Sequence, residues 1–152
     1  MPSAALPTTM PHETTHAGYT ISDDPTRLDL DAIHAYLSRS YWAATRPREI
    51  VAQSLANSLC IGLYAPTGEQ IGLVRVVTDY ATFAYLCDVY VLEAHRQRGL
   101  SKAAMAFVNA HPRLQNLRRF HLVTADAHGL YAQFGFTPIV SPERHMERRV
   151  PS

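Results

Sequence analysis

Hydrophobic side chains follow two different spacings along this chain, and the changes between them divide it into helices and strands. Apolar residues from Leu30 to Leu37 recur at helical spacing, which predicts an amphipathic helix over residues 28–39. Pro47 suits the first turn of a second helix. The apolar face of that second helix would consist of Val51, Leu55 and Leu59. An aromatic linker at residues 40–46 would join the two.

Short apolar runs bounded by turn residues predict the strands. A first short strand is expected at residues 18–21, after which the two helices intervene. Three strands then follow one another closely, at residues 60–64, 71–78 and 83–92. The first two of these form a hairpin, and the third is apolar enough to be a central strand. Later apolar runs predict three more strands, at residues 120–124, 136–140 and 146–150.

The second half of the chain contains two further predicted helices. One follows a polar turn at residues 95–99, and the other covers residues 127–134. An antiparallel meander that leads into a strand–loop–helix unit is typical of a mixed α/β, α+β-like layer fold. We therefore expect a central, mostly antiparallel sheet of six to seven strands, flanked by about four helices.

Composition and charge narrow the class of protein. A chain of 152 residues, 47% hydrophobic and 18% charged, is typical of one globular domain. Fourteen basic residues against thirteen acidic ones give a net charge of +1, which argues against a nucleic-acid partner. Cys60 and Cys87 lie in apolar runs, which favours buried, reduced thiols over a disulfide. Among the histidines, only His12 and His16 have a helical metal-ligand spacing, and they lie in a segment not predicted to be a helix, so we expect no metal.

The first seventeen residues contain no Lys or Arg and are rich in Pro, Thr, Ala and Ser. They resemble neither a secretory signal nor a mitochondrial presequence, and no run is long enough to span a membrane. We expect a flexible tail at residues 1–17, a single domain at residues 18–152 and a cytoplasmic location.

The junction between residues 89 and 102 concentrates the chemistry. A helix N-terminus leaves backbone N–H groups free to bind an anion, and Gly99 permits close approach of a ligand. Arg96, Arg98 and Lys102, the only lysine, place three cations around this turn. The spacing matches neither a P-loop nor a dinucleotide-binding motif. A plain basic turn that caps a helix stays open as the alternative.

Two segments carry a resemblance to a known family. Arg96-Gln97-Arg98-Gly99-Leu100-Ser101 resembles the acetyl-coenzyme A signature of the GNAT N-acetyltransferase superfamily, Arg/Gln-x-x-Gly-x-Gly/Ala. Residues 129–136, Gly-Leu-Tyr-Ala-Gln-Phe-Gly-Phe, resemble the second family element, Leu-Tyr-x-x-x-Gly-Phe. Ser101 departs from the signature, but a serine adds little volume to an alanine. The resemblance covers roughly residues 18–149 and extends to a small single-domain bacterial subgroup.

The resemblance implies a GNAT fold that holds acetyl-CoA at the strand–loop–helix junction. Backbone groups of Val89 and Val91 would pair with the pantetheine, and N–H groups from Arg98 to Lys102 would hold the pyrophosphate. The arginine and lysine side chains of this turn could reach the phosphates, or they could simply be solvated. The implied cofactor-binding residues are Val89, Val91, Arg96, Gln97, Arg98, Gly99, Leu100, Ser101, Lys102 and Tyr131.

Two side chains are candidates for the chemistry of acetyl transfer. Tyr131 matches the tyrosine that protonates the leaving thiolate in the family, and a neutral phenol suits that step. The alternative is an aromatic ring packed between helix and sheet. Asp88 is the candidate general base, and burial would raise its pKa. The alternative is an aspartate bonded to backbone or to an arginine such as Arg75.

Acceptor recognition is expected from the linker between the first two helices and from the turn before the central strand, because these combine aromatic area with a few charges. The candidates are Tyr41, Trp42, Arg46, Asp79, Tyr80 and Phe83. The resemblance implies an N-acetyltransferase that acts on a primary amine of a small molecule or peptide by direct attack. A non-catalytic acyl-CoA-binding or sensing domain, and a protein- or tRNA-modifying acetyltransferase, stay open, as do a monomer and a homodimer.

Overall fold

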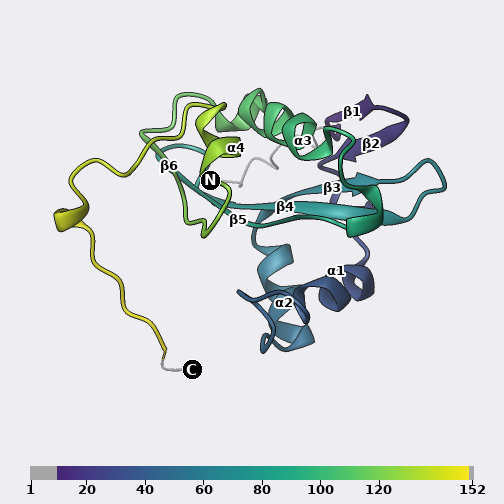
Figure 1. Cartoon of the computed structure of the whole chain (residues 1–152), viewed down its shortest axis with the longest axis horizontal. Helices are drawn as coiled ribbons and strands as arrows, with labels where there is room; N and C mark the ends of the chain where they lie inside the picture. Colours follow the sequence, from purple (N-terminus) through teal and green to yellow (C-terminus); the bar gives the residue numbers. More distant parts are fainter. Residues whose placement is uncertain (1–9, 151–152) are drawn as a thin grey trace, which may run out of the picture.

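The computed structural model describes residues 10–150, which form one six-stranded sheet with helices on both faces (Figure 1). The strands lie side by side in chain order and are antiparallel, except that β5 and β6 are parallel. They are β1 (Glu13–His16), β2 (Tyr19–Ser22), β3 (Leu59–Tyr64), β4 (Gln70–Thr78), β5 (Phe83–Val91) and β6 (Arg119–Leu122). The sheet is mixed α/β in character, as the sequence predicts.

Four α-helices cover the sheet, two on each face (Figure 1). One pair follows β2 and the other pair brackets β6. The first pair is α1 (Leu30–Leu37) and α2 (Arg48–Ala56), and the second is α3 (Leu100–Asn109) and α4 (His128–Ala132). Single turns of 3₁₀ helix lie at Pro25–Arg27, Glu93–His95, Pro112–Leu114 and Pro142–Arg144. No helix in the part of the chain that the structure describes is long and apolar enough to cross a membrane.

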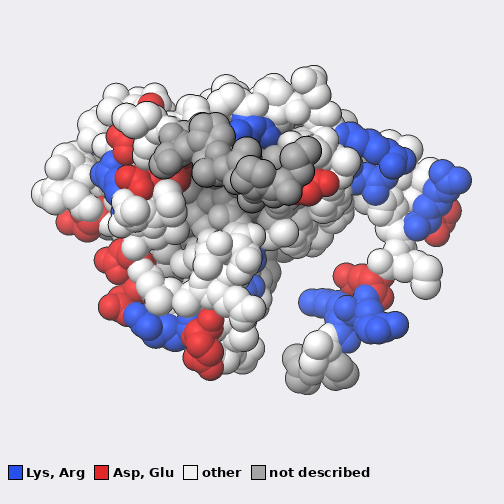
Figure 2. All heavy atoms as spheres, turned by 180° about the vertical axis from the view of Figure 1, so that it is seen from behind, with Lys and Arg blue, Asp and Glu red and all other residues white. Residues whose placement is uncertain are grey.

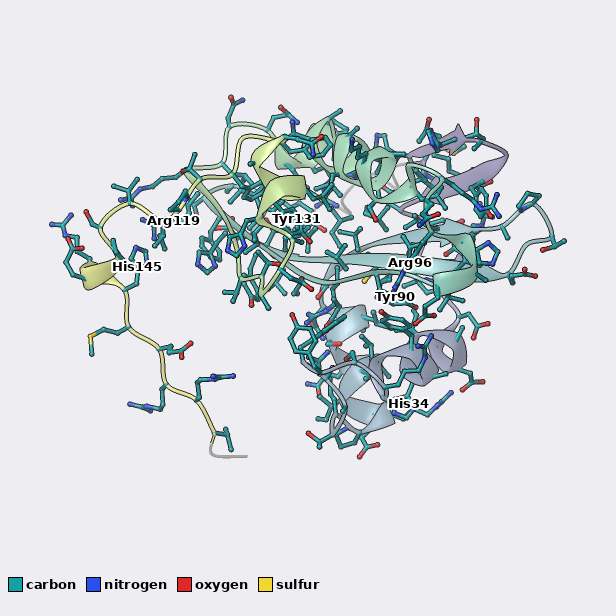
Figure 3. The ribbon with its side chains drawn as sticks, in the orientation of Figure 1. His34, Tyr90, Arg96, Arg119, Tyr131 and His145 are labelled. Carbon is teal, nitrogen blue, oxygen red and sulfur yellow. The ribbon has the colours of Figure 1, made fainter. Side chains whose placement is uncertain are left out.

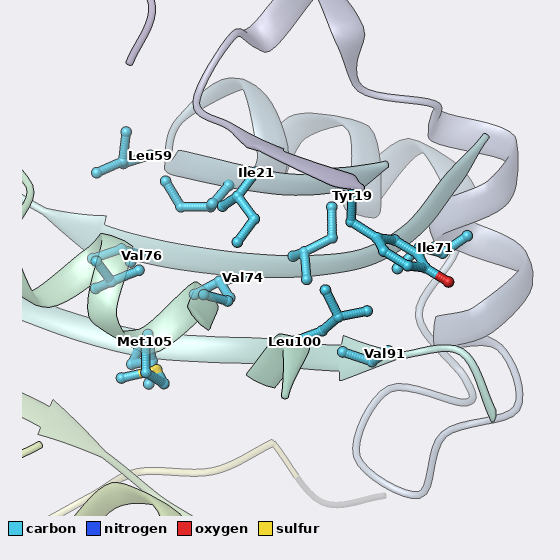
Figure 4. Packing of buried hydrophobic residues seen from close by; sticks show 14 of the residues in the cluster. Tyr19, Ile21, Leu59, Ile71, Val74, Val76, Val91, Leu100 and Met105 are labelled. Atoms are coloured by element: carbon cyan, nitrogen blue, oxygen red, sulfur yellow. The ribbon is translucent and has the colours of Figure 1, made fainter. Parts of the chain in front are cut away.

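The sheet separates two hydrophobic cores because β3 and β4 are buried on both faces. Val74 and Val76 point toward α3 and pack with Met105 (Figure 4). On the opposite face, Leu73 packs with Ile33 of α1 and with Tyr90 of β5. Burial on both faces explains why these central strands are nearly continuous apolar runs rather than alternating ones.

A bulge in the pairing of β4 and β5 opens the sheet near its centre. Leu73 lies opposite Tyr90 but Arg75 lies opposite Cys87, so β5 contains one extra residue. Asp88 sits in this bulge with a φ of 51°. On its other side β5 pairs with β6 only as far as Leu86. The outer edge of residues 87–91 therefore faces no strand in the described chain.

The N-terminal end of the sheet differs from the sequence prediction. Residues 13–16 were expected in a flexible tail but form β1, which pairs with β2 across the two-residue turn Ala17-Gly18. Both turn residues have positive φ, 51° and 83°, as such tight hairpin turns require. The prediction fails because Glu-Thr-Thr-His has no apolar residue to mark a strand. Residues 1–9 of the predicted tail lie outside the described part.

Three other expectations are also wrong. Leu59 belongs to β3, not to the face of the second helix. Residues 136–140 and 146–150 form no strand. Phe136 instead packs edge-on against Phe120 of β6, with ring centroids 5.4 Å apart. Beyond it, prolines at 138 and 142 interrupt the run.

Candidate active site

The N-terminus of α3 follows β5 through a short loop whose backbone conformation is unusual. Gln97 and Gly99 both have positive φ, 63° and 74°. Gly99 is the residue before the helix and has no side chain to cap it, so the first-turn N–H groups are open to a ligand. A Cβ at Gly99 would lie 3.2 Å from Nε2 of His16 and would adopt a strained φ. Glycine is therefore required here by backbone conformation and by close approach.

A cavity of about 370 Å³ lies at this helix end. Seven of the ten predicted cofactor residues line it, and Leu130 of the segment before Tyr131 closes it. The seven are Val91, Arg96, Gln97, Gly99, Leu100, Ser101 and Lys102. Val89, Arg98 and Tyr131 do not line this cavity. The structure thus joins the two sequence segments that carry the family resemblance.

The three cations of the loop are not equivalent. The guanidinium of Arg96 donates to the Val91 carbonyl at 2.9 Å and to the Tyr36 hydroxyl at 3.3 Å. Figure 3 shows Arg96 close to Tyr90, on the side of the sheet that carries α1. Arg98 and Lys102 are exposed and form no ion pair within residues 10–150. These two are the cations free to meet a phosphate.

Two contacts from the N-terminal hairpin hold this loop in place. Nε2 of His16 lies 2.9 Å from the Arg98 carbonyl, and the Tyr19 hydroxyl lies 2.7 Å from Nδ1 of His95. Since a carbonyl only accepts, His16 carries its proton on Nε2. The sequence did not predict His16, Tyr19 or His95 as site residues, because the hairpin lies about 80 positions before the loop in the chain. No local signal links the two.

Tyr131 is in α4, directly after Leu130, which lines the cavity (Figure 3). The residue is 8% exposed and its ring packs edge-on against Phe136. Burial raises the pKa of Tyr131, and the nearby charges of Asp126 and Tyr41 add to that rise. The raised pKa keeps the Tyr131 hydroxyl protonated at neutral pH.

Asp88 lies in the β5 bulge, with its side chain 1% exposed and both oxygens occupied. Arg75 Nε donates to it at 2.7 Å, Arg46 at 2.9 Å and Trp42 Nε1 at 2.8 Å. Burial alone would raise the pKa of Asp88, but the charge and hydrogen bond of Arg75, then Arg46 and Trp42, outweigh burial and lower it. The expected rise is therefore wrong. The bond to Arg75 is the alternative that the sequence left open.

The six predicted acceptor residues do not form one group. Tyr41, Trp42 and Arg46 lie together over the Asp88 bulge, and Tyr41 and Trp42 pack edge-on at 5.1 Å. Tyr80 instead lies under the Arg113 guanidinium, 3.5 Å from its ring centroid, and packs against the core that contains α3.

Asp79 and Phe83, the remaining two, also lie apart from the linker. Asp79 accepts hydrogen bonds from the N–H groups of Ala81, Thr82 and Phe83 and closes the β4–β5 turn. Those bonds, with the Thr82 hydroxyl first, lower the pKa of Asp79. Phe83 stacks beside His121, with ring centroids 6.4 Å apart. Asp79 therefore shapes a turn, and Phe83 belongs to the surface of β5 and β6.

Neither cysteine is activated as a nucleophile. Both are free, and burial raises the pKa of Cys60 to about 12 and that of Cys87 to about 11. A thiol with such a pKa is fully protonated at neutral pH, and the thiolate is the reactive form. Cys87 adjoins Asp88 in the bulge as a protonated thiol.

One group of side chains has distances that would suit a metal. The ligand atoms of His12, Asp23 and His111 lie within 4.8 Å of one another. However, Nδ1 of His111 accepts the N–H of Arg113 at 3.2 Å, so its proton is on Nε2 and points at Asp23, 2.8 Å away. A protonated nitrogen cannot bind a metal. The three residues instead connect β1 and β2 to the end of α3, beside an open hollow of about 750 Å³.

Comparisons with known proteins agree on one family. The model of the acetyltransferase (GNAT) family matches residues 21–136. A Gibberella zeae protein, FG08082, which carries an acetyltransferase assignment, is 36% identical in an alignment of 145 positions, which covers 82% of this chain and 82% of that protein. A crystal structure of a GNAT-family protein from Xanthomonas campestris pv. campestris is 50% identical, with a TM-score of 0.86 over 90% of this chain and 96% of that chain.

A more distant structure shows the fold alone. It is an acetyltransferase-type protein of Deinococcus radiodurans R1, with 19% identity and a TM-score of 0.65 over 91% of this chain and 98% of that one.

Proposed function

The chain belongs to the GNAT acetyltransferase family, and on that premise we propose that it transfers the acetyl group of acetyl-CoA to a primary amine of a small molecule or peptide. The proposal rests mainly on the position of the cavity next to an unpaired strand edge. The cavity at the α3 N-terminus adjoins the edge of β5 that faces no strand within residues 10–150. A phosphate-bearing, amide-bearing ligand fits both.

The residues present suit acetyl-CoA. The pyrophosphate would accept hydrogen bonds from the backbone N–H groups in the first turn of α3, beside Arg98 and Lys102. The pantetheine amides would pair with backbone groups at Val89 and Val91, as an added strand does. The Val91 carbonyl already accepts a hydrogen bond from Arg96. The backbone of Val89 is therefore the better candidate to pair with the pantetheine. Arg96 would then shape the end of the strand and not bind phosphate.

Tyr131 supplies the acid in this proposal. The amine nitrogen bonds to the acetyl carbon, the carbon–sulfur bond breaks, and the sulfur takes the Tyr131 hydroxyl proton. The amine loses its own proton to solvent, and solvent returns one to Tyr131, so the enzyme is unchanged after each turnover. Its raised pKa keeps the phenol protonated until that step.

Direct attack, without an acetyl-enzyme intermediate, is supported by the state of the cysteines. Cys87 is the nucleophile nearest the bulge, and its pKa of about 11 leaves no thiolate to attack a thioester. Asp88 is engaged by three donors and its pKa is lowered. We assign Asp88 the part of a positioning residue that holds Trp42 and Arg46 over the bulge, in place of the general base that the sequence suggests.

The acceptor would enter over the α1–α2 linker. Tyr41 is 75% exposed there and contributes to the raised pKa of Tyr131, which supports an acceptor position near the proposed acid. An aromatic and cationic rim of Tyr41, Trp42 and Arg46 suits a small acceptor with an apolar part and an acidic group. A cytoplasmic location remains a prediction from the sequence.

The test is a thiol-release screen of the purified full chain with acetyl-CoA and separate panels of amines, amino acids, polyamines and N-terminal peptides. We expect amine-dependent CoA release from at least one class, and calorimetric acetyl-CoA binding that Gly99→Glu abolishes while unfolding stays cooperative. Binding without release in every panel would favour a non-catalytic acyl-CoA sensor. Unchanged binding in Gly99→Glu would contradict the proposed cofactor site.

A further inference from the structure

The last described part of the chain leaves the domain as an extended arm, residues 137–150, which we call the C-terminal arm. Figures 1 and 2 show it standing clear of the body. Within the described chain, all its hydrogen bonds are local: the Arg144 N–H to the Ser141 carbonyl, the His145 N–H to the Pro142 carbonyl, and the Thr137 hydroxyl to the Pro138 carbonyl. Within the described chain, the arm therefore makes no hydrogen bond to its own sheet.

The arm has the sequence of strands but not their partners. Its apolar residues predict strands at residues 136–140 and 146–150, yet neither forms here. Val140, Met146 and Val150 are 80%, 97% and 92% exposed. Strand-forming segments with exposed apolar side chains and unpaired backbone are templates for pairing with another chain.

A matching bare surface lies at the β6 end of the sheet, on the face that carries α1 and α2. We call it the sheet-end patch: Val77, Phe83, Tyr85, His121 and Val123. The imidazole of His121 stacks with Phe83 and Tyr85, and Val123 is 74% exposed. Neither helix reaches it, because both pack over Leu73 and Tyr90. The outer edge of β6 also pairs with no other strand of the described chain.

These two regions hold most of the uncovered apolar surface. Of the ten exposed large hydrophobic side chains in residues 10–150, six lie in the arm or the patch. They are Val77, Phe83, Val123, Val140, Met146 and Val150. The charges of the arm are mixed, Glu143 and Glu147 with three arginines, so the arm selects no strongly charged partner. One chain thus exposes two apolar surfaces of the same kind.

We propose that this face binds a second copy of the chain, with each C-terminal arm lying on the sheet-end patch and β6 edge of the other copy. Such an exchange about a two-fold axis covers both arms and both patches in one step. The chain directs its own arm outward: Phe136 is anchored on Phe120, Thr137 and Ser141 each precede a proline, and Ser141 has a φ of 58°.

The electrostatics agree with an arm on the patch side of the sheet. Burial and then the charge of His145 lower the pKa of His121. Burial raises the pKa of Tyr85, and the charge of Glu147 is one of several smaller contributions. Both arm residues are thus within electrostatic range of the patch, while the arm itself makes no hydrogen bond to it.

The oligomeric state tests this proposal. We expect the full chain to elute in size exclusion with light scattering as a dimer of about 34 kDa, twice the 17.0 kDa of one chain. Val140→Asp in the arm and Val123→Asp in the patch should each weaken dimerisation about tenfold or more, because each buries a charge at the contact. Circular dichroism should show that both variants remain folded, since both sites are exposed in one chain.

Ile50→Asp is the matched control, a similar change at an exposed apolar residue of α2 outside both surfaces. It should leave the dimer intact. A wild-type chain that stays at 17 kDa at 100 µM (roughly the concentration at which weak interfaces assemble) would overturn the proposal. So would a dimer that neither the arm nor the patch variant weakens, because it would use another surface.

Discussion

The carboxylate of Asp88 accepts a hydrogen bond of 2.7 Å from Nε of Arg75, at the point where the pairing of β4 and β5 slips by one residue. The bulge turns Asp88 into the space under the α1–α2 linker, where Trp42 and Arg46 also donate to it. This one buried carboxylate therefore connects the sheet to the linker proposed to bind the acceptor. Its ion pairs and hydrogen bonds lower its pKa although it is buried, which makes Asp88 a poor general base.

Asp88→Asn should destabilise the fold by about 3 kcal/mol, because it leaves Arg75 and Arg46 without their buried counter-charge. The folded-state pKa of Asp88 is lowered. Its contribution is therefore fully present above the unfolded value of about 3.9 and is lost as pH falls through the folded pKa. Urea unfolding of both proteins from pH 7 downward should show the difference shrink only below about pH 4.

Asp31→Asn is the control for this change. Asp31 pairs with Arg48 at 2.7 Å, but the two side chains are 83% and 54% exposed. An exposed pair contributes about 0.5 kcal/mol at most. Equal destabilisation by the two variants at pH 7 would contradict a buried ion-pair role for Asp88.

Tyr131→Phe should lower turnover about 100-fold or more and leave acetyl-CoA affinity within about twofold, because it removes one proton donor and little volume. Stopped assays of thiol release and calorimetry measure the two effects separately. Tyr64→Phe provides the comparison, since the Tyr64 hydroxyl is buried and unpaired on β3. Parallel losses of turnover and affinity in Tyr131→Phe would make Tyr131 a packing residue and not an acid.

Gly99→Ala should weaken acetyl-CoA binding about tenfold, because the new methyl meets His16 at 3.2 Å and the φ of 74° is strained. Gly68→Ala separates strain from binding. Gly68 also has a positive φ, 100°, but no atom within 4 Å of the added carbon. Both variants should lose about 1 kcal/mol of stability, and only Gly99→Ala should lose affinity. Equal affinities would show that the loop does not hold the cofactor.

His16→Ala should weaken acetyl-CoA binding about fivefold, since it removes the hydrogen bond that fixes the Arg98 carbonyl, worth about 1 kcal/mol. His16→Gln retains a side-chain N–H donor and should recover part of the loss. Thr14→Ala, at an exposed position of the same strand, should bind as the wild type does. Calorimetry that detects no difference between His16→Ala and Thr14→Ala would leave the hairpin without a part in cofactor binding.

The sequence predicted the elements and the junction well because their signals are local. Helical spacing marks α1 and α3, apolar runs mark β3 to β5, and a glycine after a basic turn marks the helix end at Gly99. The two family segments lie on either side of one cavity. β1 escaped prediction because its residues are polar, and residues 136–140 and 146–150 were overpredicted because an apolar run does not specify a partner.

By itself, then, the sequence determined the family, the order of most elements and the position of the turn proposed to bind the cofactor, since these depend on patterns within a few residues of one another. Only the tertiary structure decided the partners of Asp88, which are 46, 42 and 13 positions away along the chain. It also decided that Arg96 donates hydrogen bonds to Val91 and Tyr36, and that His16 donates one to the Arg98 carbonyl of the loop. Contacts between distant segments depend on strand register and on a single bulge, which no local pattern encodes.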